Sequence, residues 1–98
     1  MTSAIKNVFW TDLGSESYTG VVAFVAEFSL KAAIELDEKV EHLLTRLSKH
    51  NFSCPPSSKI PRYRHCVVTK NVSVMYEIQE GDIFVVAVVD NRADHLYF

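Results

Sequence analysis

The chain has 98 residues, of which 48% are hydrophobic and 22% are charged, and its net charge is −2 at neutral pH. This length supports one hydrophobic core, and the composition is that of a folded domain rather than a disordered segment. The acidic balance does not favour a general nucleic-acid binder, because such proteins usually present a basic surface to phosphates.

The sequence also argues against a membrane protein. Its longest apolar run, residues 83–89, is far shorter than the roughly 20 residues that cross a bilayer as a helix. The N-terminus has neither a basic segment followed by an apolar one nor a small-residue cleavage site. We therefore expect a single domain over residues 1–98, located in the cytoplasm and without a membrane partner.

The N-terminal half predicts a strand followed by two helices. The segment "AIKNVFW" (residues 4–10) has strand character, and the "TD" that follows favours a helix N-cap. A helix is expected from near Asp12 to Phe28, since its apolar residues recur at spacings of three and four. Ser29 is a second N-cap candidate, and residues 30–50 carry the most regular helical stripe. Almost no loop separates the two helices, which indicates a helical hairpin.

The C-terminal half predicts three antiparallel strands. A Pro- and Ser-rich connection, residues 51–61, ends the second helix. Strand-like segments follow at residues 62–69, 72–79 and 82–90, separated by dipeptides that suit tight hairpin turns. The expected fold class is α+β: an N-terminal strand, a helical hairpin and a three-stranded antiparallel meander, forming one sheet packed on the two helices.

Cysteine and histidine spacing gives no sign of a metal site. Cys54 and Cys66 do not have metal-ligand spacing, and the histidines form no His-x-x-x-His pair. In a compact cytoplasmic domain we expect reduced, structural thiols, with a disulfide or a metal role as less favoured alternatives. Neither a metal nor another cofactor is expected.

Basic residues are concentrated in one part of the chain. Residues 53–74 contain no Asp or Glu, and their basic residues are Lys59, Arg62, Arg64 and Lys70. A basic patch on an otherwise acidic protein is therefore expected. The chain then ends in "NRADHLYF", which places Arg92, His95 and Tyr97 directly after the last predicted strand.

Several ordered segments of the chain resemble the RelE/ParE superfamily of bacterial toxins from type II toxin–antitoxin pairs. The segments are "FWTD", "FVAEFSLKAA", "LLTRL", "RHCVVTKNVSVMYEI" and "DIFVVAVVDNR", and they cover nearly the whole chain. The resemblance implies a strand, a helical hairpin and a curved antiparallel meander. It also implies one of two activities, since RelE-like members cleave mRNA on the ribosome and ParE-like members inhibit DNA gyrase. A cognate antitoxin neutralises both kinds of toxin.

The resemblance further implies a set of site residues. RelE-like ribonucleases have basic residues near the second strand and after the fourth, and often a His or Tyr close to the C-terminus. The matching catalytic candidates here are Arg64, Arg92, His95 and Tyr97, and the RNA-contacting candidates are Lys49, Lys59, Arg62 and Lys70. The arginines would hold the phosphate, His95 would transfer a proton, and Tyr97 would contact a base.

Each candidate also has a structural interpretation. Arg62 and Arg64 could point to solvent from an edge strand. Arg92 could form a surface ion pair with Asp90 or Asp94.

Other residues are expected to be structural as well. The C-terminal His95 and Tyr97 could belong to a frayed terminus. His65 is interpreted as an ordinary strand-face residue, and Tyr76 as a core residue.

The leading functional interpretation is a toxin that acts as a metal-independent, ribosome-dependent mRNA endoribonuclease. Its expected partners are a cognate antitoxin, the ribosome and mRNA. The first alternative is a non-enzymatic inhibitor of DNA gyrase, and the second is a non-toxic homologue that only binds its antitoxin.

Overall fold

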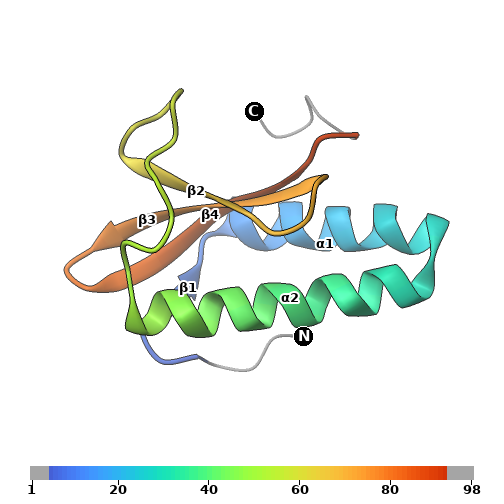
Figure 1. Ribbon diagram of the computed structural model, residues 1–98, viewed down its shortest axis with the longest axis horizontal. Helices are drawn as coiled ribbons and strands as arrows, with labels where there is room; N and C mark the ends of the chain where they lie inside the picture. Colours follow the sequence, from blue (N-terminus) through green and yellow to red (C-terminus); the bar gives the residue numbers. More distant parts are fainter. Residues whose placement is uncertain (1–4, 93–98) are drawn as a thin grey trace.

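The computed structural model describes residues 5–92, which form a four-stranded sheet with a helical hairpin on one face (Figure 1). In chain order the elements are β1 (Val8–Trp10), α1 (Asp12–Phe28), α2 (Leu30–Lys49), β2 (Tyr63–Val67), β3 (Val72–Gln79) and β4 (Asp82–Asp90). The expected α+β arrangement is confirmed. No helix within residues 5–92 is long and apolar enough to cross a membrane.

The N-terminus of α1 is tied directly to β4. The Thr11 hydroxyl accepts a hydrogen bond from the Gly14 N–H at 2.9 Å and donates one to the Val85 carbonyl at 3.0 Å. A Cβ on Gly14 would lie only 2.1 Å from that same carbonyl oxygen. Glycine is a weak helix former, but here only a residue without a Cβ permits the close approach of helix and strand.

Ser29 ends one helix and begins the next. Its N–H donates to the Val25 carbonyl at 3.0 Å, which closes α1. Its hydroxyl accepts from the Ala32 N–H at 3.1 Å, which caps α2. One residue therefore satisfies backbone groups of both helices, and the hairpin needs no longer loop.

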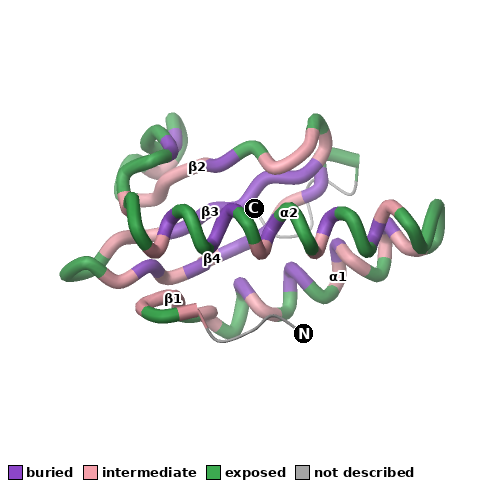
Figure 2. The backbone as a smooth tube through the Cα atoms, turned by 60° about the horizontal axis from the view of Figure 1, so that its bottom comes forward, coloured by how far each residue is buried: buried purple, intermediate pink, exposed green. Residues whose placement is uncertain are grey.

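The second helix is strongly amphipathic. Its regularly spaced apolar residues are buried, as Figure 2 shows in purple: Ala33, Leu36, Val40, Leu43, Leu44 and Leu47. Fully burying one leucine side chain contributes about 1.5–3 kcal/mol. The basic residues Arg46 and Lys49 lie in the last turn, where positive charge complements the helix dipole.

The strand order in the sheet is β1-β4-β3-β2. β1 pairs with β4 in parallel, and the other two pairings are antiparallel. The β3–β4 hairpin has a two-residue turn, because Gln79 pairs with Asp82. The turn residues Glu80 and Gly81 have φ values of 53° and 84°. Positive φ at both central residues is what a two-residue type I′ hairpin turn requires.

Side chains alternate between the two faces of the sheet, and the helix-facing side carries the core. The alternation shifts at a bulge, where Met75 pairs with Ala87 but Tyr76 pairs with Val85. Tyr76 is fully buried, and its hydroxyl donates to the Asn51 carbonyl at 2.6 Å. Its expected core position is confirmed.

The connection after α2 folds back along the outer edge of β2. The His65 N–H donates to the Pro55 carbonyl at 3.0 Å, and the Ser57 N–H donates to the Tyr63 carbonyl at 2.8 Å. One step further along this pairing, Cys54 and Cys66 form a disulfide. The expectation of reduced thiols is therefore wrong for this structure. Spacing along the chain does not reveal that the connection pairs with β2 and brings the two sulfur atoms together.

Candidate functional site

A hollow of about 220 Å³ lies on the sheet face opposite the helices. Part of its wall is the loop of residues 57–60. The remaining lining residues come from β2, β3, β4 and the residue that follows β4: His65, Ser73, Met75, Val89 and Asn91. Pockets that combine apolar walls with a few convergent polar groups are typical binding sites.

His65 is the titratable strand residue in this hollow. Its neighbour Cys66 faces the core, so alternation along β2 directs His65 to the opposite face. The His65 Nε2 atom is buried and has no hydrogen-bond partner among the described residues. Buried polar atoms are usually satisfied, so the unpartnered Nε2 singles out His65 among the residues that line this hollow.

Lys59 brings positive charge to the same hollow. The Ser57 hydroxyl accepts hydrogen bonds from the Lys59 and Ile60 N–H groups, both at 3.3 Å, and this fixes the turn that carries Lys59. The Lys59 side chain is exposed at the rim. Together, His65 and Lys59 offer a proton-transfer group and a cation in one place.

The disulfide holds this loop against β2. Cys54 and Cys66 are both buried and close a loop with a sequence separation of 12 that includes Ser57, Lys59 and His65. A cross-link that closes a loop of about 15 residues contributes roughly 3 kcal/mol in the chain-entropy description. The disulfide therefore restricts how far the loop of residues 57–60, which we call the Lys59 loop, can move from β2, the strand that carries His65.

Arg64 belongs to the helix side of the sheet. It lies across from Tyr76, whose side chain is in the core. The Arg64 Nη1 atom donates to the Cys54 carbonyl at 2.6 Å, and the guanidinium lies 4.7 Å from the centre of the Phe52 ring. Arg64 thus holds the connection after α2 and does not line the hollow.

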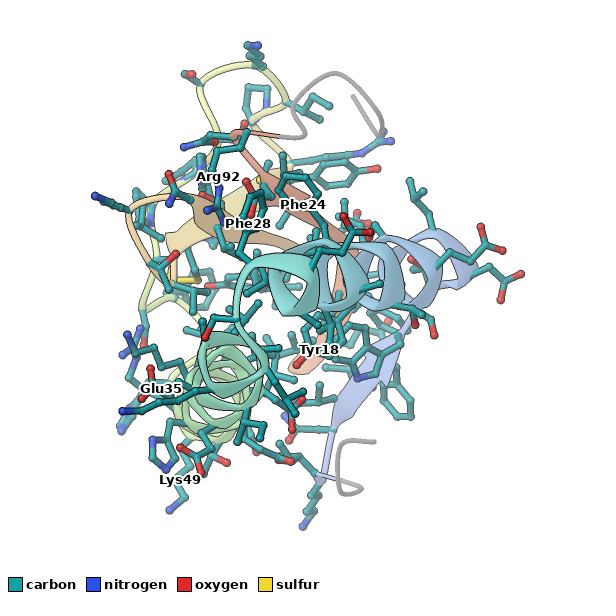
Figure 3. The ribbon with its side chains drawn as sticks, turned by 90° about the vertical axis from the view of Figure 1, so that its right-hand side faces the viewer. Tyr18, Phe24, Phe28, Glu35, Lys49 and Arg92 are labelled. Carbon is teal, nitrogen blue, oxygen red and sulfur yellow. A yellow bond between two sulfur atoms is a disulfide. The ribbon has the colours of Figure 1, made fainter. Side chains whose placement is uncertain are left out.

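Arg92 is held at the other end of the helix side. Its Nε and Nη2 atoms donate to the two carboxylate oxygens of Asp90 at 3.0 and 2.7 Å. Figure 3 shows Arg92 beside Phe24 and Phe28, whose ring centres lie 5.5 and 5.4 Å from the guanidinium. The hydrogen bond to Asp90 raises the pKa of Arg92. The expected ion pair of Arg92 with Asp90 is present, but it is not a surface pair, because the Asp90 side chain is buried.

The structure does not bring Arg64 and Arg92 together. Arg92 lies beside the end of α1, where α2 begins, whereas Arg64 contacts Phe52 just beyond the end of α2. A helix of 20 residues is about 30 Å long. The two arginines are therefore separated by most of the length of α2, which is too far for both to hold one phosphate.

The other predicted residues are dispersed. Lys49 ends α2, and Lys70 lies in the β2–β3 turn. Arg62 is exposed beside Tyr63, with its guanidinium 5.0 Å from the ring centre. The predicted His95 and Tyr97 lie outside the described residues.

Of the RNA-contacting candidates, Lys59 lines the hollow. His65 lines it as well, although the sequence alone indicates only an ordinary strand-face residue at this position. The alternation in "YRHCV" could have identified it. Once Cys66 is assigned to the core, His65 must face away from the helices. What the sequence lacks is any sign that residues 57–60 return to the same face.

The hollow brings together an imidazole, from His65, and an ammonium group, from Lys59. Within residues 5–92, no group of three or more His, Cys, Asp or Glu side chains could hold a metal ion. An imidazole can accept and return a proton near neutral pH, and an ammonium group stabilises negative charge on phosphate oxygens.

Neither a scan against models of known protein families nor a search of the curated proteins found a match to this chain.

Proposed function

We propose that this protein is the toxin of a type II toxin–antitoxin pair and that it cleaves mRNA on the ribosome, using the hollow around His65. The unpartnered His65 Nε2 beside the Lys59 loop carries this proposal. The order of strand, helical hairpin and meander agrees with the fold that the RelE/ParE resemblance implies. The proposal also places the protein in the cytoplasm, where the ribosome and mRNA are.

In the proposed reaction, the ribose 2′-oxygen attacks the adjacent phosphorus and the bond to the 5′-oxygen breaks. His65 accepts the proton of the 2′-hydroxyl, and Lys59 stabilises the extra negative charge on the phosphate oxygens. The 5′-oxygen leaves with a proton, and the other product is a 2′,3′-cyclic phosphate. His95 and Tyr97 remain the predicted candidates for supplying that proton and for contacting a base.

A translating cell extract tests the proposal directly. The purified protein should truncate the message at positions occupied by ribosomes. His65→Ala and Lys59→Ala should each slow cleavage by at least about tenfold, which corresponds to about 1.4 kcal/mol of transition-state stabilisation. Lys31→Ala is the matched control, because Lys31 is exposed on α2 and does not line the hollow. Intact message at high protein concentration would contradict the proposal.

The gyrase-inhibitor alternative is supported by a different observation. Arg64 and Arg92, the arginines expected to hold phosphate, are already bound to a backbone carbonyl and to a carboxylate. A protein that acts only by binding needs no free catalytic arginine. A supercoiling assay separates the two activities: inhibition of gyrase with intact mRNA favours this alternative. Expression without growth arrest favours a non-toxic homologue that binds the antitoxin.

The disulfide provides a separate test of the cytoplasmic location. Cytoplasmic reductants normally keep cysteines as thiols. Protein recovered from cells under acid quench can be alkylated before and after reduction and then weighed by mass spectrometry. Thiols at Cys54 and Cys66 agree with the cytoplasm, and an intact disulfide indicates an oxidising compartment.

A further inference from the structure

A basic groove runs between α2 and the edge of the sheet formed by β2 and the β2–β3 turn. It consists of two adjoining hollows of about 260 and 250 Å³ that share Lys39. The first extends from Arg92 to Lys70, and the second contains His42 and Arg46. We refer to the two hollows together as the α2 groove.

The basic side chains of the α2 groove are arranged with helical spacing. Lys39, His42 and Arg46 are exposed and follow one another at intervals of three and four residues, so they form a row along one flank of α2. The acidic residues Asp37 and Glu38 line a different hollow, between α1 and α2. Lys39, Arg46 and Lys70 outnumber Glu35, the acidic residue in the same groove, so the groove is basic although the net charge of the chain is −2.

Three cations of the groove, Lys39, Arg46 and Lys70, form no ion pair within the described part of the chain. The ion pair found there joins Arg92 to Asp90, and none involves Lys39, Arg46 or Lys70. Glu35 also lines the groove, which leaves the balance of charge positive. Unpaired cations in a groove favour an anionic partner and suppress a basic one.

The floor of the groove is apolar. Leu36 and Leu43 of α2 lie on one side, and Val67 and Val68 lie on the other. Phe28, at one end of the groove, is 66% exposed. An apolar floor with a basic rim fits an amphipathic protein segment that carries both apolar and acidic side chains.

The β2 edge of the sheet offers few free backbone groups to which a strand of a partner could pair. Residues 55–57 already pair with residues 63–65 of β2, and they occupy the outward-facing groups of that part of the strand. An added strand needs a run of free backbone groups. A helix needs no free backbone groups from this protein. Side chains at positions i, i+3 and i+7 of such a helix have the same spacing as Lys39, His42 and Arg46 on α2.

We propose that the α2 groove binds an acidic amphipathic helix of a partner protein, with its apolar face on the groove floor and its carboxylates toward Lys39 and Arg46. Identifying this partner with the antitoxin rests on the proposed function. The binding itself does not, because the groove lies on the helix side of the sheet and the His65 hollow lies on the opposite side.

A fluorescein-labelled peptide of about 21 residues tests the proposal, because shorter isolated helices are marginal. It carries Leu at the a and d positions of each heptad and Glu at e and g. Fluorescence anisotropy should show saturable binding to the intact protein. A matching peptide with Lys in place of Glu, and a single-stranded oligouridylate of similar charge, should bind at least about tenfold more weakly.

Charge reversal locates the binding surface. Lys39→Glu/Arg46→Glu should weaken binding of the acidic peptide at least about tenfold, whereas Lys6→Glu/Lys31→Glu, with the same change in net charge, should leave it within about twofold. Circular dichroism must show both variants folded. The proposal is overturned if the two variants bind alike, if the Lys peptide binds as well, or if the oligouridylate alone binds and depends on Lys39 and Arg46.

The same variants separate this inference from the proposed function. His65→Ala should bind the acidic peptide as the unchanged protein does. If the Lys39→Glu/Arg46→Glu variant loses the peptide while mRNA stays intact in all samples, the groove is supported and the ribonuclease proposal fails. If message is cut but the peptide does not bind, the groove proposal fails and the ribonuclease proposal stands.

Discussion

Arg64 and His65 are adjacent in β2, but they serve opposite faces of the sheet. Arg64 donates to the Cys54 carbonyl on the helix side, whereas His65 borders the hollow on the other side. The guanidinium therefore stabilises the connection after α2, and the imidazole, whose Nε2 atom is buried and unpartnered, borders the hollow. This division predicts different consequences for the two substitutions.

Arg64→Ala should lower the free energy of unfolding by about 1.5–3 kcal/mol, because it removes a charge-assisted hydrogen bond to a backbone carbonyl. Urea unfolding measures this loss. Arg62→Ala is the matched control, since Arg62 is exposed and its removal should leave the urea midpoint nearly unchanged. A direct catalytic role for Arg64 would instead appear as lost cleavage with unchanged stability.

Gly14→Ala should destabilise the fold even though alanine is the better helix former. The added Cβ would meet the Val85 carbonyl oxygen at 2.1 Å, so α1 must move away from β4. Overpacking of this kind typically costs about 1–3 kcal/mol. Thermal unfolding should show a lower Tm, and Thr19→Ala, on the exposed side of the same helix, should not. A Tm equal to or above that of the unchanged protein would contradict the close approach.

Removing the disulfide should lower stability by about 3 kcal/mol, as expected for a loop of about this size. The Cys54→Ser/Cys66→Ser variant should unfold at lower urea than the oxidised protein. Dithiothreitol should shift the unchanged protein toward the variant but have no effect on the variant itself. If dithiothreitol leaves the unchanged protein unaffected, the cross-link does not contribute to its stability.

Stability should fall at high pH because two buried tyrosines resist ionisation in the folded state. Burial raises the pKa of Tyr18, with a further contribution from its hydrogen bond to Asp37, and burial also raises the pKa of Tyr76. Both folded-state values exceed the unfolded value of about 10. The stabilising contribution is complete below pH 10 and is lost as pH rises toward the folded-state pKa values.

Each of these tyrosines should add up to about 1.4 kcal/mol per pH unit to the fall above pH 10. Urea unfolding between pH 8 and about pH 11.5 measures the slope, which Tyr18→Phe and Tyr76→Phe should each reduce. An unchanged slope in both variants would show that other groups, such as lysines, control the transition.

Local pattern alone predicts most of the fold. The helical spacing in residues 30–50, the capping potential of Ser29 and the two-residue turn at Glu80 and Gly81 all act between residues close in sequence. The strands observed at Val72–Gln79 and Asp82–Asp90 have the predicted bounds. The first strand begins at Val8, later than predicted, because Asn7 has a φ of 57°, which is not a strand conformation. The Asn7 side-chain amide instead donates a hydrogen bond to the Gly81 carbonyl.

The order and type of the elements follow from the amino-acid sequence, because helix periodicity, strand alternation and turn chemistry are local properties. Tertiary structure alone decided which residues meet. It placed the Lys59 loop beside His65, separated Arg64 from Arg92 along α2, and joined Cys54 to Cys66. These outcomes depend on how residues 51–61 fold back on β2 and on which face each strand residue takes, and both follow from packing between distant segments.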